Sequence, residues 1–495
     1  MTNGDDLKRK GSGIFAVHGG LLIALVVLSI TVGIIIGLKI PSSIRSPGKG
    51  VSGESGGESA LPAGSSVSPA ITGAGGEDEM PARNQPERPS QEVEGLQGVQ
   101  DAQEAEQDAK EAEQDAQGAS GASGSHGGAG APGTEETRPD STSTTADSDP
   151  GANKIAELVA SMTLHEKICQ MLIVSTDSLT GVPGTTVAWS VTRAAIEEYP
   201  VGGITHFASN ITDDYQINLF NTTAQSYAKI PMFIAADEEG GRVYRLGQKV
   251  GAHSLRAMLS YEEGGEEVAF ENARTLAEAL KRHGFNTDFA PVADVWSNSE
   301  NTVIGDRAYS SDFDNAAILV AAAVRGFSDS GVVCTLKHFP GHGDTREDSH
   351  YSAAYVQKTL SELRLGEFKP FIAGIAAGAD MVMLGHLIVP DVDELPAPLS
   401  QGIVTDILRK ELGFSGVIIT DALEMSAISS HYTTEFVALA AVNAGVDILL
   451  MPADIGATIS AITAAVEDGM IPESRIDESV TRIIALKVSK GIMDL

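Results

Sequence analysis

Short apolar runs alternate with amphipathic stretches along the chain from about residue 152 onward. Continuous apolar runs of this kind are typical of strands buried on both faces of a parallel sheet. We predict eight such strands, at residues 168–175, 202–207, 232–236, 287–291, 332–336, 381–384, 417–420 and 447–451. Apolar positions recur with helical spacing in the intervening stretches, and we predict helices there at residues 267–282, 314–328 and 361–377.

Eight strands alternating with helices over residues 152–495 predict an α/β fold, namely a (β/α)8 barrel of the TIM type. A doubly wound open sheet would show the same alternation with fewer strands. That alternative is not favoured, because no Gly-x-Gly-x-x-Gly segment opens a helix within residues 152–495.

Charged residues follow almost every predicted strand, which is where a barrel of this type carries its catalytic groups. They are Asp237, Glu238, Glu239 and Arg242 after the third strand, Asp294, Asp306 and Arg307 after the fourth, Lys337 and His338 after the fifth, His386 after the sixth and Asp421 after the seventh. A purely structural protein has no need of charges at these positions. The pattern therefore indicates an enzyme.

The N-terminal region predicts a membrane anchor. Residues 11–38 are 28 residues without Asp, Glu, Lys or Arg, enough for a helix to cross a hydrocarbon core of about 30 Å. Lys8, Arg9 and Lys10 precede this run, so residues 1–10 are expected in the cytoplasm. A cleaved signal peptide would have a shorter apolar core, of about 7–15 residues. We therefore expect a single-pass protein of the cell membrane with its catalytic domain outside the cell.

Residues 39–151 form a low-complexity segment. Its part from residue 41 to residue 150 contains no Phe, Trp, Tyr or Cys and is dominated by small and polar residues. Such a composition cannot bury enough apolar surface to offset its ordering entropy, so we predict a disordered linker. The net charge of −33 argues against nucleic acid as a partner.

A polar loop follows the fifth predicted strand at residues 337–350, with the sequence Lys-His-Phe-Pro-Gly-His-Gly-Asp-Thr-Arg-Glu-Asp-Ser-His. Pro340 and two glycines exclude a regular helix here. The loop closely resembles the signature loop of family 3 glycoside hydrolases, specifically that of their bacterial β-N-acetylhexosaminidase branch. The resemblance implies a barrel, a small carbohydrate substrate such as an N-acetylglucosaminide or a peptidoglycan fragment, and no cofactor.

Asp421 stands at the end of the seventh predicted strand, in the segment Thr-Asp-Ala-Leu-Glu-Met. This context is similar to the Thr-Asp-x-Leu-x-Met segment that holds the family's nucleophile, so the resemblance implies that Asp421 attacks the anomeric carbon. The alternative is a helix N-cap, since Asp is a good capping residue.

The resemblance also implies that His350 is the acid/base and that Asp348 is the carboxylate paired with it. An imidazole titrates near neutral pH and can both give and take a proton, and a neighbouring carboxylate stabilises its protonated form. Positions that hold sugar hydroxyls and the N-acetyl group in the family match Asp237, Arg245, Arg307, Lys337 and His338. His342 is expected to shape the loop by hydrogen bonding.

A metal site is not favoured, although His338, His342, Asp344, Asp348 and His350 are close in sequence. Pro340 and Gly341 interrupt any helix that would place the first two histidines on one face.

The chain has two cysteines, Cys169 and Cys334, each inside an apolar run that we predict as a strand. This placement favours two buried thiols over a disulfide.

The leading functional hypothesis is a retaining β-N-acetylhexosaminidase that removes terminal β-linked N-acetylglucosamine from cell-wall or chitin-type sugars. Three alternatives stay open: a β-glucosidase, a β-N-acetylglucosaminide phosphorylase, and a catalytically inactive wall-binding protein. The family's β-glucosidases usually take their acid/base from a following domain, whereas the printed sequence stops soon after the eighth predicted strand.

Overall fold

The computed structural model describes residues 150–346 and 354–495. The predicted membrane anchor at residues 11–38 lies outside these residues, as does almost all of the predicted linker. None of the helices in the two described ranges is both long enough and apolar enough to span a bilayer.

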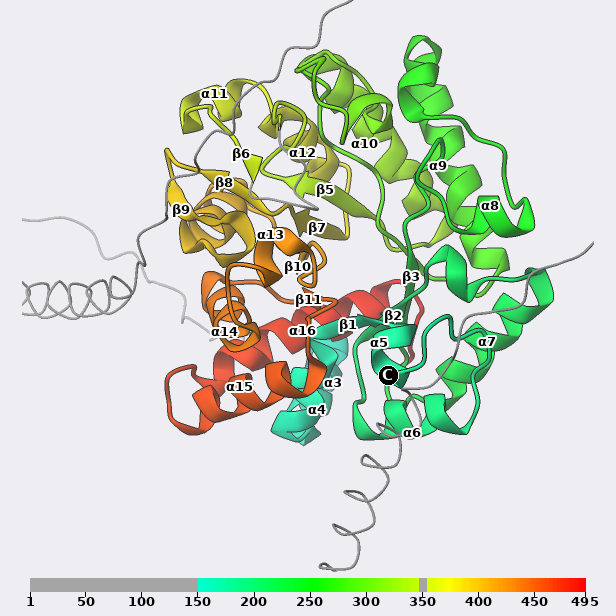
Figure 1. The fold of residues 1–495 in the computed structure, drawn as a ribbon, viewed down its shortest axis with the longest axis vertical. Coiled ribbons are helices and arrows are strands. Elements are labelled where there is room, and N and C mark those ends of the chain that lie inside the picture. The colour runs from blue at the N-terminus through cyan, green and yellow to red at the C-terminus, as the bar shows by residue number, and fades with distance from the viewer. Residues whose placement is uncertain (1–149, 347–353) are drawn as a thin grey trace, which may run out of the picture. The chain divides into compact units, whose positions relative to one another are not determined.

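Eight parallel strands form a nearly closed barrel (Figure 1). They are β1 (Leu172–Ser175), β2 (Gly203–Thr205), β3 (Phe233–Ala236), β4 (Thr287–Asp288), β5 (Thr335–Phe339), β7 (Met381–Leu384), β10 (Val417–Thr420) and β11 (Leu449–Leu450). Hydrogen bonding gives the orders β11-β1-β2-β3-β4 and β10-β7-β5. Parallel bridges from Thr287 to Val333 and from Ile419 to Ile448 join the two groups into a ring. The predicted barrel of eight parallel strands is confirmed.

Helices surround the strands, as Figure 1 shows. The α-helices are α3 (Pro150–Ser161), α4 (Leu164–Gln170), α5 (Thr176–Thr180), α6 (Ser190–Glu198), α7 (Asp214–Tyr227), α8 (Leu246–Val250), α9 (Gly265–Arg282), α10 (Phe313–Ser330), α11 (Leu360–Leu365), α12 (Phe368–Ala376), α13 (Ser426–Ser429), α14 (Thr434–Ala444), α15 (Ile455–Glu467) and α16 (Glu473–Ser489). Short 3-10 turns are η1 (Ala208–Asn210), η2 (Met258–Gly264), η3 (Gly305–Arg307) and η4 (Ala397–Leu399), and η5 (Gly402–Glu411) is a π-type helix.

Several predicted boundaries differ from the structure, and two of these differences have a clear local cause. The strand predicted to begin at residue 168 begins at Leu172, because residues up to Gln170 belong to α4. Thr163 and Glu166 form a capping box at the start of α4, which stabilises the helix over this apolar stretch. The helix predicted at residues 361–377 is two helices, α11 and α12, because the backbone leaves helical geometry at Gly366.

A small sheet at the side of the barrel escaped prediction. It consists of β6 (Ala354–Tyr355), β8 (Leu387–Val389) and β9 (Asp393–Pro396), with β8 in the middle. Ala354 pairs with Leu387, so the chain that follows residues 347–353 is tied to the loop after β7. These strands, of two to four residues, are too short to give a periodic signal.

Both cysteines are buried and unpaired, as predicted. Cys169 lies in α4 and not in the first strand, and Cys334 lies immediately before β5. Burial raises the pKa of the Cys169 thiol to about 12 and raises that of Cys334 further. Both side chains therefore behave as small apolar groups of the core.

Candidate active site

A cavity of about 300 Å³ opens among the carboxyl ends of the barrel strands. That volume is at the lower end of the range for small-molecule sites, roughly 300–1,000 Å³. Six of the predicted site residues line it: Asp237, Arg245, Arg307, Lys337, His338 and Asp421. Four segments distant in sequence supply them, because successive strands of a barrel end at the same rim.

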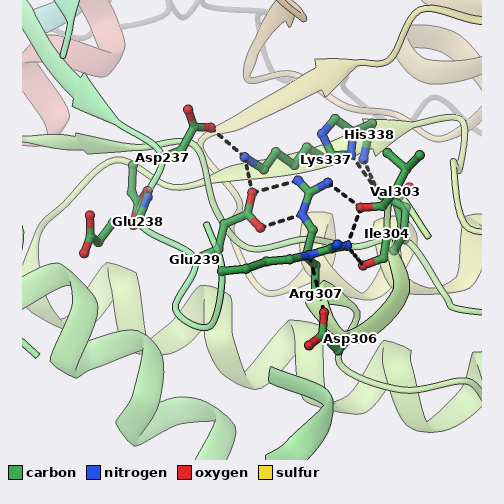
Figure 2. A network of polar contacts seen from close by, with 12 residues as sticks. Asp237, Glu238, Glu239, Val303, Ile304, Asp306, Arg307, Lys337 and His338 are labelled. Carbon is green, nitrogen blue, oxygen red and sulfur yellow. Dashed lines mark hydrogen bonds and ion pairs between the residues drawn. The ribbon is translucent and has the colours of Figure 1, made fainter. Parts of the chain in front are cut away.

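Lys337 and Arg307 are held in the cavity by two carboxylates (Figure 2). Lys337 Nζ lies 2.8 Å from Asp237 Oδ1 and 2.6 Å from Glu239 Oε1. Arg307 makes a bidentate contact with Glu239, with both N–O distances at 2.8 Å. Burial disfavours the charge on Glu239, but Arg307 and Lys337 overcome it and hold its pKa well below the ordinary value. Glu239 is therefore a fixed anion rather than an acid.

Asp237 also contacts Arg245, whose Nη2 lies 3.2 Å from Asp237 Oδ2. Burial again disfavours the charge, but Lys337 and Arg245 lower the pKa of Asp237 below its usual value. One carboxylate thus lies between two cations at the edge of the cavity. Such a group can accept hydrogen bonds from vicinal hydroxyls while the cations donate to a ligand.

The loop that carries Arg245 is organised by Glu238, which is fully buried. Its carboxylate accepts hydrogen bonds from the backbone N–H groups of Arg245, Leu246 and Gly247, at 2.7 to 2.8 Å. A fourth contact joins it to His253 Nε2 at 2.6 Å. Figure 2 shows Glu238 directed away from Lys337. Glu238 is thus a structural anchor for the loop.

His338 is oriented by Asp294, a fully buried carboxylate. His338 Nδ1 lies 2.7 Å from Asp294 Oδ2, and the His338 backbone N–H donates to the same oxygen at 3.1 Å. Although burial opposes it, the neighbouring His338 and His342 lower the pKa of Asp294. An ionised carboxylate can only accept, so Nδ1 of the His338 ring is the donor in this contact. The peptide bond between Lys337 and His338 is cis.

The segment after β5 lies very close to the segment after β4. An added Cβ on Gly343 would lie 1.7 Å from the Val295 carbonyl oxygen, so no other residue fits this position. His342 donates its backbone N–H to Asp294 Oδ1 at 2.6 Å, and its ring lies 2.7 Å from the Thr345 hydroxyl. Burial lowers the pKa of His342 to about 4, so this ring is neutral and structural, in line with the prediction.

Asp421 follows β10 directly and points into the cavity. Its backbone N–H donates to the Leu384 carbonyl at 2.9 Å, which fixes it against β7. Burial opposes ionisation, but the nearby His386 and His338 lower the pKa of Asp421, so it is a carboxylate at neutral pH. The helix-cap alternative is wrong, because the next helix, α13, begins only after Met425.

Asp348 and His350, the predicted acid/base pair, lie outside the described residues. The flanking residues on both sides are described, and the downstream side lies near the cavity. Ala354 pairs with Leu387. His386, the residue before Leu387, contacts the carbonyl of Ala422 through Nε2 at 2.9 Å, and Ala422 lines the cavity.

Three residues of the site were noted as charged positions after strands but received no role. These are Glu239, Asp294 and His386, which respectively pair with the cavity cations, orient His338, and lie beside Asp421. Their position at strand ends was the available signal. Within residues 150–346 and 354–495, no cluster of three potential ligands could hold a metal ion.

The chain is similar in sequence and in structure to known sugar-cleaving enzymes, which agrees with a cavity lined by carboxylates and cations. Residues 163–486 match the family described as glycosyl hydrolase family 3 N terminal domain. A β-hexosaminidase of Stenotrophomonas maltophilia is 33% identical over 62% of this chain and 97% of its own length. β-Hexosaminidase A of Pseudoalteromonas piscicida is 35% identical over 59% of this chain, which spans only 54% of that relative.

Among solved structures, the family 3 β-N-acetylglucosaminidase of Paenibacillus sp. superimposes with a TM-score of 0.63 at 38% identity. The match covers 67% of this chain and 63% of that protein.

Proposed function

Because the chain belongs to glycosyl hydrolase family 3, we propose that it is a retaining β-N-acetylhexosaminidase. It would remove terminal β-linked N-acetylglucosamine from cell-wall or chitin-type sugars through a covalent glycosyl-aspartate intermediate. The relatives named β-hexosaminidase and the related β-N-acetylglucosaminidase structure support this choice of sugar. We also propose that residues 11–38 anchor it in the cell membrane with the catalytic domain outside.

One observation carries the proposal: an ionised carboxylate, Asp421, lies in the same small cavity as the groups suited to hold a sugar. The other buried carboxylates nearby are committed to cations or backbone donors. Glu239 is paired with Arg307 and Lys337, and Glu238 accepts three backbone N–H groups. Among the described residues, Asp421 accepts a single backbone N–H, from Ala422 through Oδ1 at 2.7 Å, which supports its second carboxylate oxygen as the attacking group.

In the proposed mechanism, an Asp421 carboxylate oxygen forms a bond to the anomeric carbon as the bond to the leaving oxygen breaks. His350, supported by Asp348, donates a proton to that oxygen. In the second step His350 takes a proton from water, which attacks the anomeric carbon and releases Asp421. The configuration at the anomeric carbon is inverted twice and therefore retained.

The remaining residues have binding roles in this proposal. Asp237 accepts hydrogen bonds from sugar hydroxyls, while Lys337 and Arg245 donate to sugar oxygens. Arg307 and His338 complete the cradle around the N-acetylated ring. All five side chains are preoriented by contacts within the protein, which lowers the entropic cost of binding.

The position of His350 in the chain is compatible with its proposed role. His350 is four residues before Ala354, which is paired to the residue after His386. Four residues span at most about 13–14 Å. This short chain length supports the proposal that His350 acts beside Asp421.

The test is a comparison of chromogenic substrates with the whole protein. Release of the chromophore from an aryl N-acetyl-β-glucosaminide, little release from the β-glucoside, and no acceleration by phosphate are expected. Faster cleavage of the glucoside would favour the β-glucosidase. Phosphate-dependent turnover with a sugar phosphate product would favour the phosphorylase, and no turnover of either substrate would favour the wall-binding protein.

A further inference from the structure

Glu424 is a carboxylate at the mouth of the cavity that none of the described residues neutralises. It lines the cavity three residues after Asp421 and is exposed, whereas Glu239 and Lys337 deeper in the site are buried. Partial burial raises the pKa of Glu424, and no charged or hydrogen-bonding group within the described ranges offsets this effect. Its charge is therefore open to a ligand.

The backbone holds Glu424 in place at the rim. Its N–H donates to the Met451 carbonyl at 3.0 Å, and its own carbonyl accepts from the Ser429 hydroxyl at 3.0 Å. Met451 is fixed in turn to β1, since its N–H donates to the Ile173 carbonyl at 2.7 Å. Glu424 is thus tied to the barrel wall through its N–H and to α13 through its carbonyl.

The deeper cavity charges are already engaged with one another. Lys337 and Arg245 contact Asp237, and Arg307 contacts Glu239. Under the proposed function, a sugar ring held by these groups has its anomeric carbon at Asp421. Because the cavity of about 300 Å³ has little room beyond one ring, the leaving group would extend toward the mouth. The part of the substrate that meets Glu424 is therefore the aglycone.

We propose that Glu424 selects the aglycone by charge. It favours leaving groups that are neutral or cationic, such as the amino sugars of chitin-type chains. It disfavours those with a carboxylate close to the cleaved bond, such as the lactyl-ether sugar of bacterial cell wall when its lactyl carboxylate is not joined to a peptide. The inference rests on the proposed function and narrows its two substrate classes, cell-wall and chitin-type sugars, to the chitin-type one.

The experiment compares the wild-type protein with E424Q on three disaccharides that share a non-reducing N-acetylglucosamine. The reducing sugar is neutral N-acetylglucosamine, cationic glucosamine, or a sugar carrying a 3-O-lactyl carboxylate. In E424Q, kcat/KM for the anionic aglycone should rise about 3- to 10-fold, and that for the cationic one should fall by a similar factor. The neutral disaccharide should change by less than about 2-fold, and added salt should shrink the wild-type contrast.

E435Q is the matched control, because Glu435 is an exposed carboxylate at the start of α14 that does not line the cavity. E435Q removes the same unit of charge and should leave kcat/KM for all three disaccharides unchanged. The role of Glu424 would be overturned if wild type and E424Q had the same relative kcat/KM values for the three disaccharides. It would also be overturned if E424Q and E435Q changed these values equally. Either result would leave the hydrolase assignment intact. No cleavage of any N-acetylglucosaminide by the wild type would instead refute the proposed function, and the role of Glu424 with it.

Discussion

Replacing Glu239 by Gln should destabilise the fold strongly, because it removes the partner of two buried cations. The Glu239 side chain is 3% exposed and that of Lys337 2%. The substitution keeps the shape of the side chain but removes its charge. Lys337 still has Asp237 at 2.8 Å, whereas among the described residues Arg307 retains only the Val303 carbonyl at 3.2 Å and no carboxylate contact.

The expected loss in the free energy of unfolding follows from this uncompensated charge. Breaking a buried ion pair by removing one partner costs about 3–5 kcal/mol. We expect E239Q to fall near the lower end of this range, because the amide oxygen of Gln can still accept one hydrogen bond. Even this loss is a large part of the ~5–15 kcal/mol by which a domain is stable.

The loss should depend on pH in a defined direction. The folded protein holds the pKa of Glu239 well below its ordinary value of 4.5, so its contribution is fully present above that value. As the pH falls below it, the unfolded chain takes up a proton that the folded chain does not. The difference in the free energy of unfolding between wild type and E239Q should therefore shrink by about 1.4 kcal/mol for each unit by which the pH falls.

Equilibrium urea unfolding, followed by tryptophan fluorescence at several pH values, measures this difference. The control is E411Q, because Glu411 makes a bidentate contact of 2.6 and 2.7 Å with Arg364 at the surface. That exposed pair should be worth only about 0–1 kcal/mol. One contrary result is that E239Q lowers the free energy of unfolding no more than E411Q does, and another is that its effect does not change with pH. Either result would show that the contacts of Glu239 with Lys337 and Arg307 do not stabilise the protein.

Four further predictions concern the chemistry, the thiols and the topology. Asp421→Ala should lower turnover by several orders of magnitude with the fold intact, and a 5-fluoro glycosyl donor should label Asp421 in the wild type; a label elsewhere contradicts the assignment. His350→Ala should impair cleavage of a disaccharide far more than that of an activated aryl glycoside, with azide restoring part of the latter; equal losses without rescue would reduce His350 to a binding residue. Cys169 and Cys334 should resist alkylation in the folded protein and both react after denaturation without reductant, as mass spectrometry can show; protection that persists in denaturant contradicts two free thiols. Protease added to intact cells should release an active fragment that begins near residue 150, whereas active full-length protein in the cytosolic fraction would contradict an external catalytic domain.

Periodicity was sufficient for the barrel but not for its details. An uninterrupted apolar segment such as Val417–Thr420 fits a strand buried on both faces of a parallel sheet, and each of the eight predicted runs overlaps such a strand. The pattern was insufficient at residues 168–170, where a capping box extended a helix into an apolar run, and at β6, β8 and β9, which are too short to be periodic.

The sequence by itself determined the barrel, the strand ends that carry charge, and the residue types available for chemistry. These are local properties, set by hydrophobic spacing and by which side chains follow each strand. Only the tertiary structure decided which charges are free, because pairing depends on distance between segments far apart in the chain. Glu238, Glu239, Asp421 and Glu424 are all carboxylates that follow strands. Their different partners make the first a structural anchor and the second a fixed counter-ion, keep the third ionised in the cavity as the proposed nucleophile, and leave the fourth without a cation among the described residues.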